Sequence, residues 1–175
     1  MLLILLASLA SAADLVVDGT AVALSGALVY DDVRVINGGR IDVTPWNGTS
    51  GGVLEITAQS VYVDASSSIV ADGDGFRGGA TAVDGEGPGA GTVSGLNGGG
   101  GGGHGGYGSD GLDDVWDTCD VWIDNNGTPY DTAVPSTTVE MGSGGGGGND
   151  NGSGGDGGGA VWILSPSIVI EGTIS

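Results

Sequence analysis

Six consecutive glycines at residues 98–103 restrict the possible folds of this chain more than any other feature. Glycine loses the most backbone entropy on ordering and has no side chain to bury, so such a run forms neither a helix nor an ordinary strand. Two further runs, at residues 144–148 and 157–159, repeat the pattern. The chain must therefore either hold these runs by backbone contacts or leave them as linkers.

An internal repeat gives the second constraint. Residues 51–65 align with residues 158–172 without a gap. Aliphatic residues coincide at alternate positions in the pairs Leu54/Val161, Ile56/Ile163, Val61/Ile168 and Val63/Ile170. A period of two is typical of strands, so the repeating unit is predicted to be a pair of short strands joined by a tight corner.

A second alignment extends the repeat towards the amino terminus. Val33 and Val35, followed by Ile41 and Val43, superpose on the later segment 61–71. Repeats that agree position by position favour stacked rungs, which share one aliphatic core, whereas an antiparallel sandwich is the competing interpretation. We predict an all-β fold, a right-handed parallel β-helix (solenoid), with rungs at residues 14–73 and a further, truncated rung at 158–175.

Between the aligned units lies a long glycine-rich insertion, residues 74–157. It includes a small β-hairpin predicted over 115–141, with a turn signal at Asn126-Gly127. Three interpretations of the glycine runs remain open: a flexible linker, a sheaf of extended polyglycine II helices, and calcium-binding turns. In a sheaf, the absence of side chains would let backbones approach and hydrogen-bond one another.

With glycine runs such as 100–106 inserted between strand repeats, the chain resembles secreted glycine-rich bacterial surface proteins that combine such insertions with β-solenoid rungs. It also resembles phage tail-fibre-tip adhesins with polyglycine sandwiches. In those adhesins, loops between the glycine helices bind the receptor. The resemblance therefore implies a ligand site, for a cell-surface glycan or protein, among aromatic residues of the insertion: Tyr107, Trp116, Trp122 and Tyr130.

Calcium is the third interpretation. Residues 105–113 fit the nonapeptide G-G-x-G-x-D-x-U-x, whose paired turns bind the ion through Asp carboxylates and backbone carbonyls. The candidate ligands are Asp110, Asp113 and, in a degenerate second copy, Asp150. No other cofactor is expected.

The amino terminus predicts export. Residues 1–13 combine a short apolar run with a small-residue cleavage pattern, as in a secretory signal peptide, and no further membrane span is expected. Cys119, the single cysteine, is expected to be a buried thiol or an intermolecular partner. The chain is predicted to be secreted or at the cell surface.

A final rung ending at Ile174 and Ser175 would leave an open edge, which suggests end-to-end self-association or a fragment.

Charge excludes several classes of function. The formal net charge is -19, with three arginines and no lysine, so nucleic acid is an improbable partner. Solenoid lyases use lysine or arginine to bind acidic sugar and abstract a proton, but this chain has no lysine, and the lone His104 lies in a glycine run. We therefore expect a non-enzymatic structural or adhesive protein. The alternatives are a carbohydrate-binding or carbohydrate-cleaving β-helix and a calcium-binding module.

Overall fold

The computed structural model describes residues 12–93, 98–104, 107–112, 122–123, 125–130, 139–149 and 152–175. Within these ranges the chain is all-β and has no helix, as the sequence predicts. The same ranges accordingly contain no apolar helix that could span a membrane. The expected signal peptide lies almost entirely outside them, as does Cys119.

Most strands belong to three parallel sheets, each made of strands that are far apart in the sequence. The first sheet stacks β1 (Leu15–Asp18), β4 (Asp32–Ile36), β7 (Ser60–Val63) and β12 (Ile168–Ile170). The second stacks β2 (Ala21–Leu24), β5 (Arg40–Val43), β8 (Ser68–Val70) and β13 (Thr173–Ile174). The third stacks β3 (Gly26–Val29), β6 (Val53–Thr57) and β11 (Ala160–Leu164).

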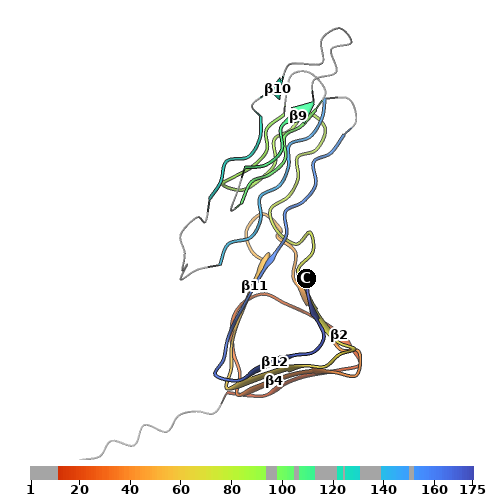
Figure 1. Cartoon of the computed structure of the whole chain (residues 1–175), viewed down its shortest axis with the longest axis vertical. Coiled ribbons are helices and arrows are strands. Elements are labelled where there is room, and N and C mark those ends of the chain that lie inside the picture. Colours follow the sequence, from red (N-terminus) through yellow and green to blue (C-terminus); the bar gives the residue numbers. More distant parts are fainter. Residues whose placement is uncertain are drawn as a thin grey trace, which may run out of the picture.

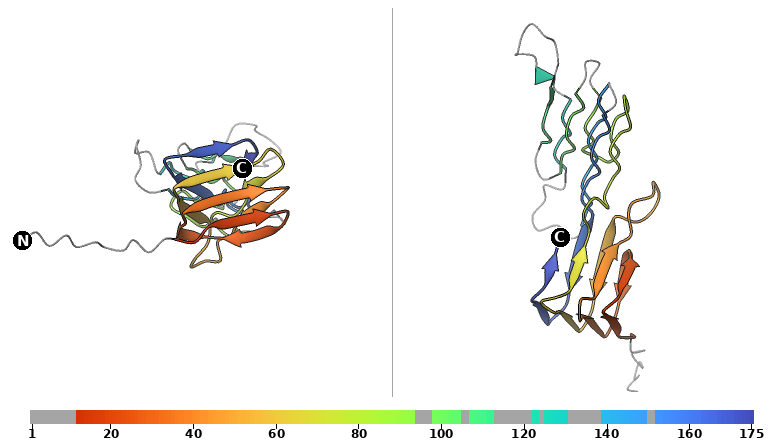
Figure 2. Two further views of the ribbon diagram at one scale, coloured as in Figure 1. Left: turned by 90° about the horizontal axis from the view of Figure 1, so that it is seen from below. Right: turned by 90° about the vertical axis from the view of Figure 1, so that its right-hand side faces the viewer.

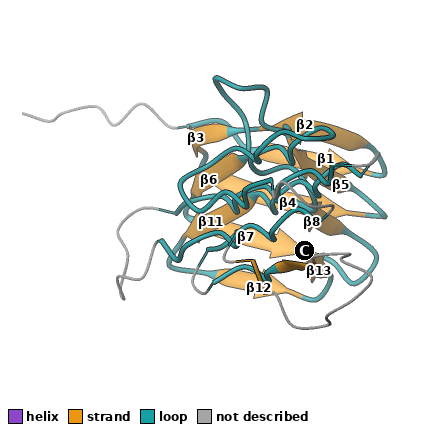
Figure 3. Ribbon diagram, turned by 90° about the horizontal axis from the view of Figure 1, so that it is seen from above, coloured by secondary structure: helices purple, strands orange, loops and turns teal. Residues whose placement is uncertain are grey.

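The chain visits the three sheets in turn, so that each complete rung contributes one strand to each sheet. The sheets form the sides of a triangle when the stack is seen end-on (Figure 1). Strands β3, β6 and β11 lie side by side along one of these sides (Figure 3). Successive rungs pair through parallel ladders, which gives a solenoid-like stack rather than a sandwich of antiparallel hairpins.

The strand register confirms both alignments made from the sequence. Leu54 pairs with Val161 and Ile56 with Ile163, where β6 meets β11. Val33 pairs with Val61 where β4 meets β7. The repeat itself is larger than the two-strand unit that the alignments indicate, because a complete rung has three strands.

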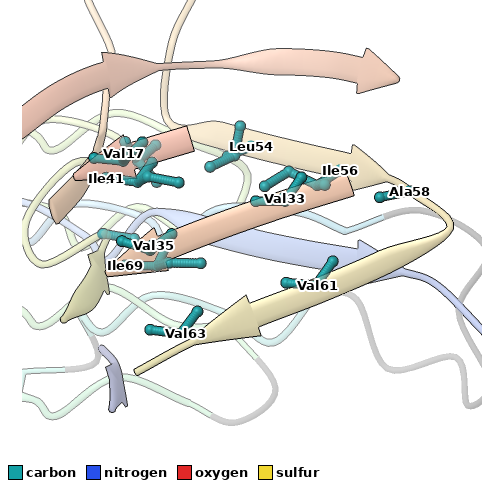
Figure 4. Close-up of a cluster of buried hydrophobic side chains, with 12 residues drawn as sticks. Val17, Val33, Val35, Ile41, Leu54, Ile56, Ala58, Val61, Val63 and Ile69 are labelled. Carbon is teal, nitrogen blue, oxygen red and sulfur yellow. The ribbon is translucent and has the colours of Figure 1, made fainter. Parts of the chain in front are cut away.

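Stacked aliphatic side chains fill the interior of the triangle. Alternate residues of the strands inside the stack, such as β4, β5, β6 and β7, point inward, so the period-two pattern places branched side chains in columns along the stack (Figure 4). Ile41 and Ile69 stack directly in one column, and both are fully buried. The buried core comprises Val17, Val33, Val35, Ile41, Val43, Leu54, Ile56, Ala58, Val61, Val63, Ile69 and Ala71.

The corner between the second and third sheets determines where the insertion lies. In the first rung this corner is Ser25 alone, and in the second it is the loop 44–52. In the third rung the insertion follows β8 and ends just before β11. Its extended segments project away from the stack of strands (Figure 2). Because both ends of the insertion are held at one corner, the sheets continue past it undisturbed.

Candidate functional site

The insertion folds into a bundle of extended segments, the glycine bundle, made of residues 75–93, 98–104, 107–112, 125–130, 141–149 and 152–159. Residues 141–148, the central segment, run through its middle. Four of its glycines are buried: Gly144, Gly145, Gly146 and Gly147. The amides of Gly142, Gly145 and Gly148 donate to the carbonyls of Gly158, Gly155 and Gly152, at 2.7, 3.0 and 2.9 Å. The donors advance by three residues while the acceptors retreat, so the two segments are antiparallel.

The carbonyls of the central segment also accept hydrogen bonds at every third residue, but from a different neighbouring segment. Those of Gly142, Gly145 and Gly148 accept from the amides of Phe76, Gly79 and Ala82, at 3.0, 2.8 and 3.0 Å. Both series advance together, so these two segments are parallel. A β-strand bonds to neighbours on two sides with a period of two, whereas a period of three is that of a threefold extended helix.

Intervening residues of the central segment bond in further directions. The Gly144 amide donates to Glu86 O at 3.0 Å, and the Gly146 amide donates to Gly100 O at 2.8 Å. The central segment thus bonds to four stretches of backbone, at residues 76–82, 86, 100 and 152–158. A flat sheet cannot provide this arrangement, because each strand in a sheet has at most two bonded neighbours.

Close contact between backbones makes glycine necessary at most of these positions. A Cβ placed on Gly147 would lie 1.9 Å from Ala80 O, and one placed on Gly154 would lie 2.0 Å from Gly145 O. Real Cβ atoms essentially never approach within 3.0 Å. By contrast, a Cβ on Gly155 or Gly158 would meet no atom within 4 Å. The glycine runs are therefore packed elements and not linkers.

Asn125 joins three segments of the bundle through its side chain, which is buried. Its Oδ1 accepts from the Gly111 amide at 2.8 Å. Its Nδ2 donates to Thr92 O at 3.2 Å and to Gly98 O at 3.0 Å. All the hydrogen-bonding groups of this buried side-chain amide thus pair with backbone, which connects segments that are far apart in the sequence.

Aromatic residues attach the base of the bundle to the stack of rungs. Trp46, in the loop 44–52, packs edge-on against Phe76 with ring centroids 5.4 Å apart. Its indole Nε1 donates to Glu86 Oε2 at 2.9 Å, and its backbone amide donates to Asp74 O at 2.9 Å. Met141 is buried at the same junction, against Gly52. The second-rung loop therefore orients the insertion that leaves the third rung.

The predicted aromatic ligand residues are placed only in part. Tyr107 is 73% exposed. Tyr130 is half-buried, stacks on His104 at a centroid distance of 4.8 Å, and donates its hydroxyl to the Met141 carbonyl. Trp122 lies in β10 (Trp122–Ile123), which pairs antiparallel with β9 (Gly111–Leu112). Trp116 and most of the hairpin expected at 115–141 lie outside the described residues.

Of the predicted calcium ligands, only Asp110 lies within the described residues. Its Oδ1 accepts from the side-chain amide of Asn126 at 2.6 Å. Asp113 and Asp150 fall outside the described ranges. In the part of the chain that is described, no three histidine, cysteine or acidic side chains are grouped as a metal site.

A carboxylate with a strongly lowered pKa, Asp64, lies at a polar corner of the stack, where the first sheet turns into the second. Asp64 accepts from the hydroxyl of Ser67 at 2.6 Å and from the Asn37 amide at 2.6 Å. These bonds stabilise the carboxylate and lower the pKa of Asp64 to about 2. At the base of the glycine bundle, partial burial and then the charge of Asp42 raise the pKa of Asp74.

Comparison with family models, with curated proteins and with solved structures found no significant match. Function is therefore inferred from the residues and geometry of this chain alone.

Sequence reasoning missed two features of the site. The sequence marks Asn125 only as a neighbour of a turn signal, because nothing in a local window shows that its side chain will meet three distant segments. It presents Trp46 only as one of several aromatic residues on loops, although Trp46 anchors the bundle. A usable signal is present for Trp46, since its loop occupies the corner that the insertion occupies one rung later.

Proposed function

We propose that the chain is a non-enzymatic structural or adhesive protein of the cell exterior, in which a right-handed parallel β-helix carries a polyglycine II bundle. The observation that carries this proposal is the buried, hydrogen-bonded glycine segment at residues 141–148. Among the residues that the structure describes, the interior of the bundle consists largely of backbone. What it provides is a stiff projection held by backbone hydrogen bonds.

The position of the bundle supports an adhesive role. It projects away from the strands of the stack (Figure 2), and its base is anchored by Trp46, Phe76 and Met141. Tyr107, with 73% of its surface exposed, belongs to the bundle and not to the aliphatic core. A projection of this kind can present loops to a cell-surface glycan or protein at a distance from the stack.

Composition supports export and an environment outside the cytoplasm. The amino-terminal segment has the pattern of a signal peptide, and the net charge of -19 keeps a glycine-rich surface dispersed. A lyase reaction is disfavoured because the chain has no lysine and only three arginines to bind an acidic sugar and abstract a proton. His104, the single histidine, is stacked on Tyr130.

A matched pair of proteins tests the proposal. The control replaces residues 72–158 with the corner sequence 44–52 of the second rung, which closes the same corner there. The full chain and the control are applied to a glycan array and to immobilised cell-surface protein, and reducing ends released from polysaccharides are assayed in parallel. We expect binding by the full chain, loss of binding in the control, and no released ends. Product formation by the full chain would show that the protein is an enzyme and would refute the proposal.

A further inference from the structure

One face of the glycine bundle is hollowed by a groove with a volume of about 360 Å³. Its walls are residues 99–101 with Ser109 on one side and residues 152–155 on the other, and Gly145 and Gly146 form part of its floor. The floor residues are buried, whereas Gly152, Ser153 and Gly155 on the rim are exposed. The groove therefore runs along the central segment, between two of the segments that bond to it.

Backbone atoms make up almost the whole surface of this groove. Apart from two serines, every residue that lines it is glycine. Among the described residues, the amides of Gly99, Ser109 and Gly155 have no hydrogen-bond partner, and the carbonyls of Gly99 and Gly154 accept no bond. Residues that line the groove thus carry both donors and acceptors that make no bond within the described part of the chain.

The groove lies beside the central segment, where the bundle has room for one more extended segment. Elsewhere in the bundle, the neighbours of residues 141–148 are extended segments that bond through their backbones. Close packing there leaves no room for a Cβ, as at Gly147, where an added Cβ would lie 1.9 Å from Ala80 O. An occupant that packed in the same way would need to be extended and largely free of side chains.

We propose that the groove binds an extended glycine-rich segment of another protein, which joins the bundle as an additional member. The mode is analogous to strand addition at a sheet edge, with main-chain hydrogen bonds supplying the affinity. A sugar is a poor fit, because no aromatic or charged side chain lines the groove. A second copy of this chain is also disfavoured, since its described glycine segments are already packed within its own bundle. The chemistry of the groove supports this partner whether or not the whole chain is an adhesin.

The structure provides a variant that should fill the groove without disturbing the fold. Gly155 lines the groove, and a Cβ there meets nothing within 4 Å. Its backbone is also outside the positive-φ region that disfavours side chains. Gly155→Val should therefore place two methyl groups in the groove. If that variant failed to fold, Gly152→Val would serve, because the nearest atom to its added Cβ is 3.7 Å away.

The test is a titration of the ¹⁵N-labelled full chain with acetyl-hexaglycine amide, followed by amide chemical shifts. We expect saturable shifts at Gly99, Ser109 and Gly155, little effect at Gly142, and at least a tenfold loss of affinity in Gly155→Val. Acetyl-hexaalanine amide, the matched control, should cause no saturable shift because its methyl groups clash with the walls.

Four results would overturn the proposal. The first is the absence of saturable shifts in the wild-type protein. The second is equal binding of the alanine peptide, and the third is equal binding of hexaglycine by the valine variant. The fourth is concentration-dependent shifts at these amides without peptide, abolished by Gly155→Val, which would show that a second copy occupies the groove.

Discussion

Replacing Gly154 with alanine tests directly whether the glycine runs are packed elements or linkers. The added Cβ would lie 2.0 Å from Gly145 O and 2.5 Å from Gly145 C, both backbone atoms that cannot rotate away. To reach the 3.0 Å below which real Cβ contacts essentially never occur, the two segments must separate by about 1 Å. Hydrogen bonds of 2.8 to 3.0 Å do not survive such a displacement.

The magnitude follows from the bonds that this displacement breaks. The Gly154 amide donates to Gly79 O, the Gly79 amide donates to Gly145 O, and the Gly145 amide donates to Gly155 O, at 2.8, 2.8 and 3.0 Å. A net contribution of about 1 kcal/mol for each bond gives a local destabilisation of about 3 kcal/mol. Amide exchange governed by local opening should therefore accelerate about a hundredfold.

Gly155→Ala is the matched control, one residue away on the same segment. Its Cβ meets no atom within 4 Å, so the substitution should stabilise the protein by about 0.5 kcal/mol through a less flexible unfolded chain. Exchange at the amides of Gly79 and Gly145, measured by NMR in both variants, separates packing from flexibility. Equal exchange rates in Gly154→Ala, Gly155→Ala and the wild-type protein would refute the packed bundle and restore the linker interpretation.

Four further measurements address the rest of the molecule. Ile41→Ala removes a fully buried side chain and should lower the free energy of unfolding in urea by about 2 to 5 kcal/mol, and a change below about 1 kcal/mol would contradict the stacked core. Asn125→Ala should accelerate exchange of the Gly111 amide, whose bond to Oδ1 is lost, and unchanged protection would remove Asn125 from its joining role. Because the folded-state pKa of Asp64 is about 2, below its ordinary 3.8, the stability it contributes is present above about pH 4 and lost as the pH falls towards 2. The acid-unfolding curve of Asp64→Asn should therefore be flatter in that range than that of the wild-type protein, and identical curves would count against the corner network. A chelator should leave the melting temperature unchanged, since no calcium is required by the proposed fold, and a fall in melting temperature would instead support the calcium-binding alternative.

Prediction from the sequence succeeded where the periodicity was local or repeated. Alternation in 53–57 and 160–164 indicates strands, and the gap-free match between these segments places Leu54 beside Val161, as the parallel ladder does. Parallel stacking conserves register from rung to rung, so a sequence alignment is also a map of contacts. Between β4 and β5, Asn37 and Gly38 have positive φ, which these two residue types adopt more readily than others.

The bundle could not be predicted in the same way. Glycine carries no side chain, so the sequence of a run such as 144–148 says nothing about which segments lie beside it. The threefold hydrogen bonding, the partners of Asn125 and the groove beside Gly155 all depend on backbones that meet across long stretches of chain. Only the folded structure could distinguish a packed bundle from a flexible linker.

By itself, then, the sequence determined the register of the aligned strands and the place of the insertion, because branched side chains at a period of two must be buried and similar rungs can stack only in register. It did not show that a complete rung has three strands. The tertiary structure decided what the glycines do. A residue without a side chain shows no preference for its neighbours until other backbones lie close enough to exclude a Cβ, as they do around Gly147 and Gly154.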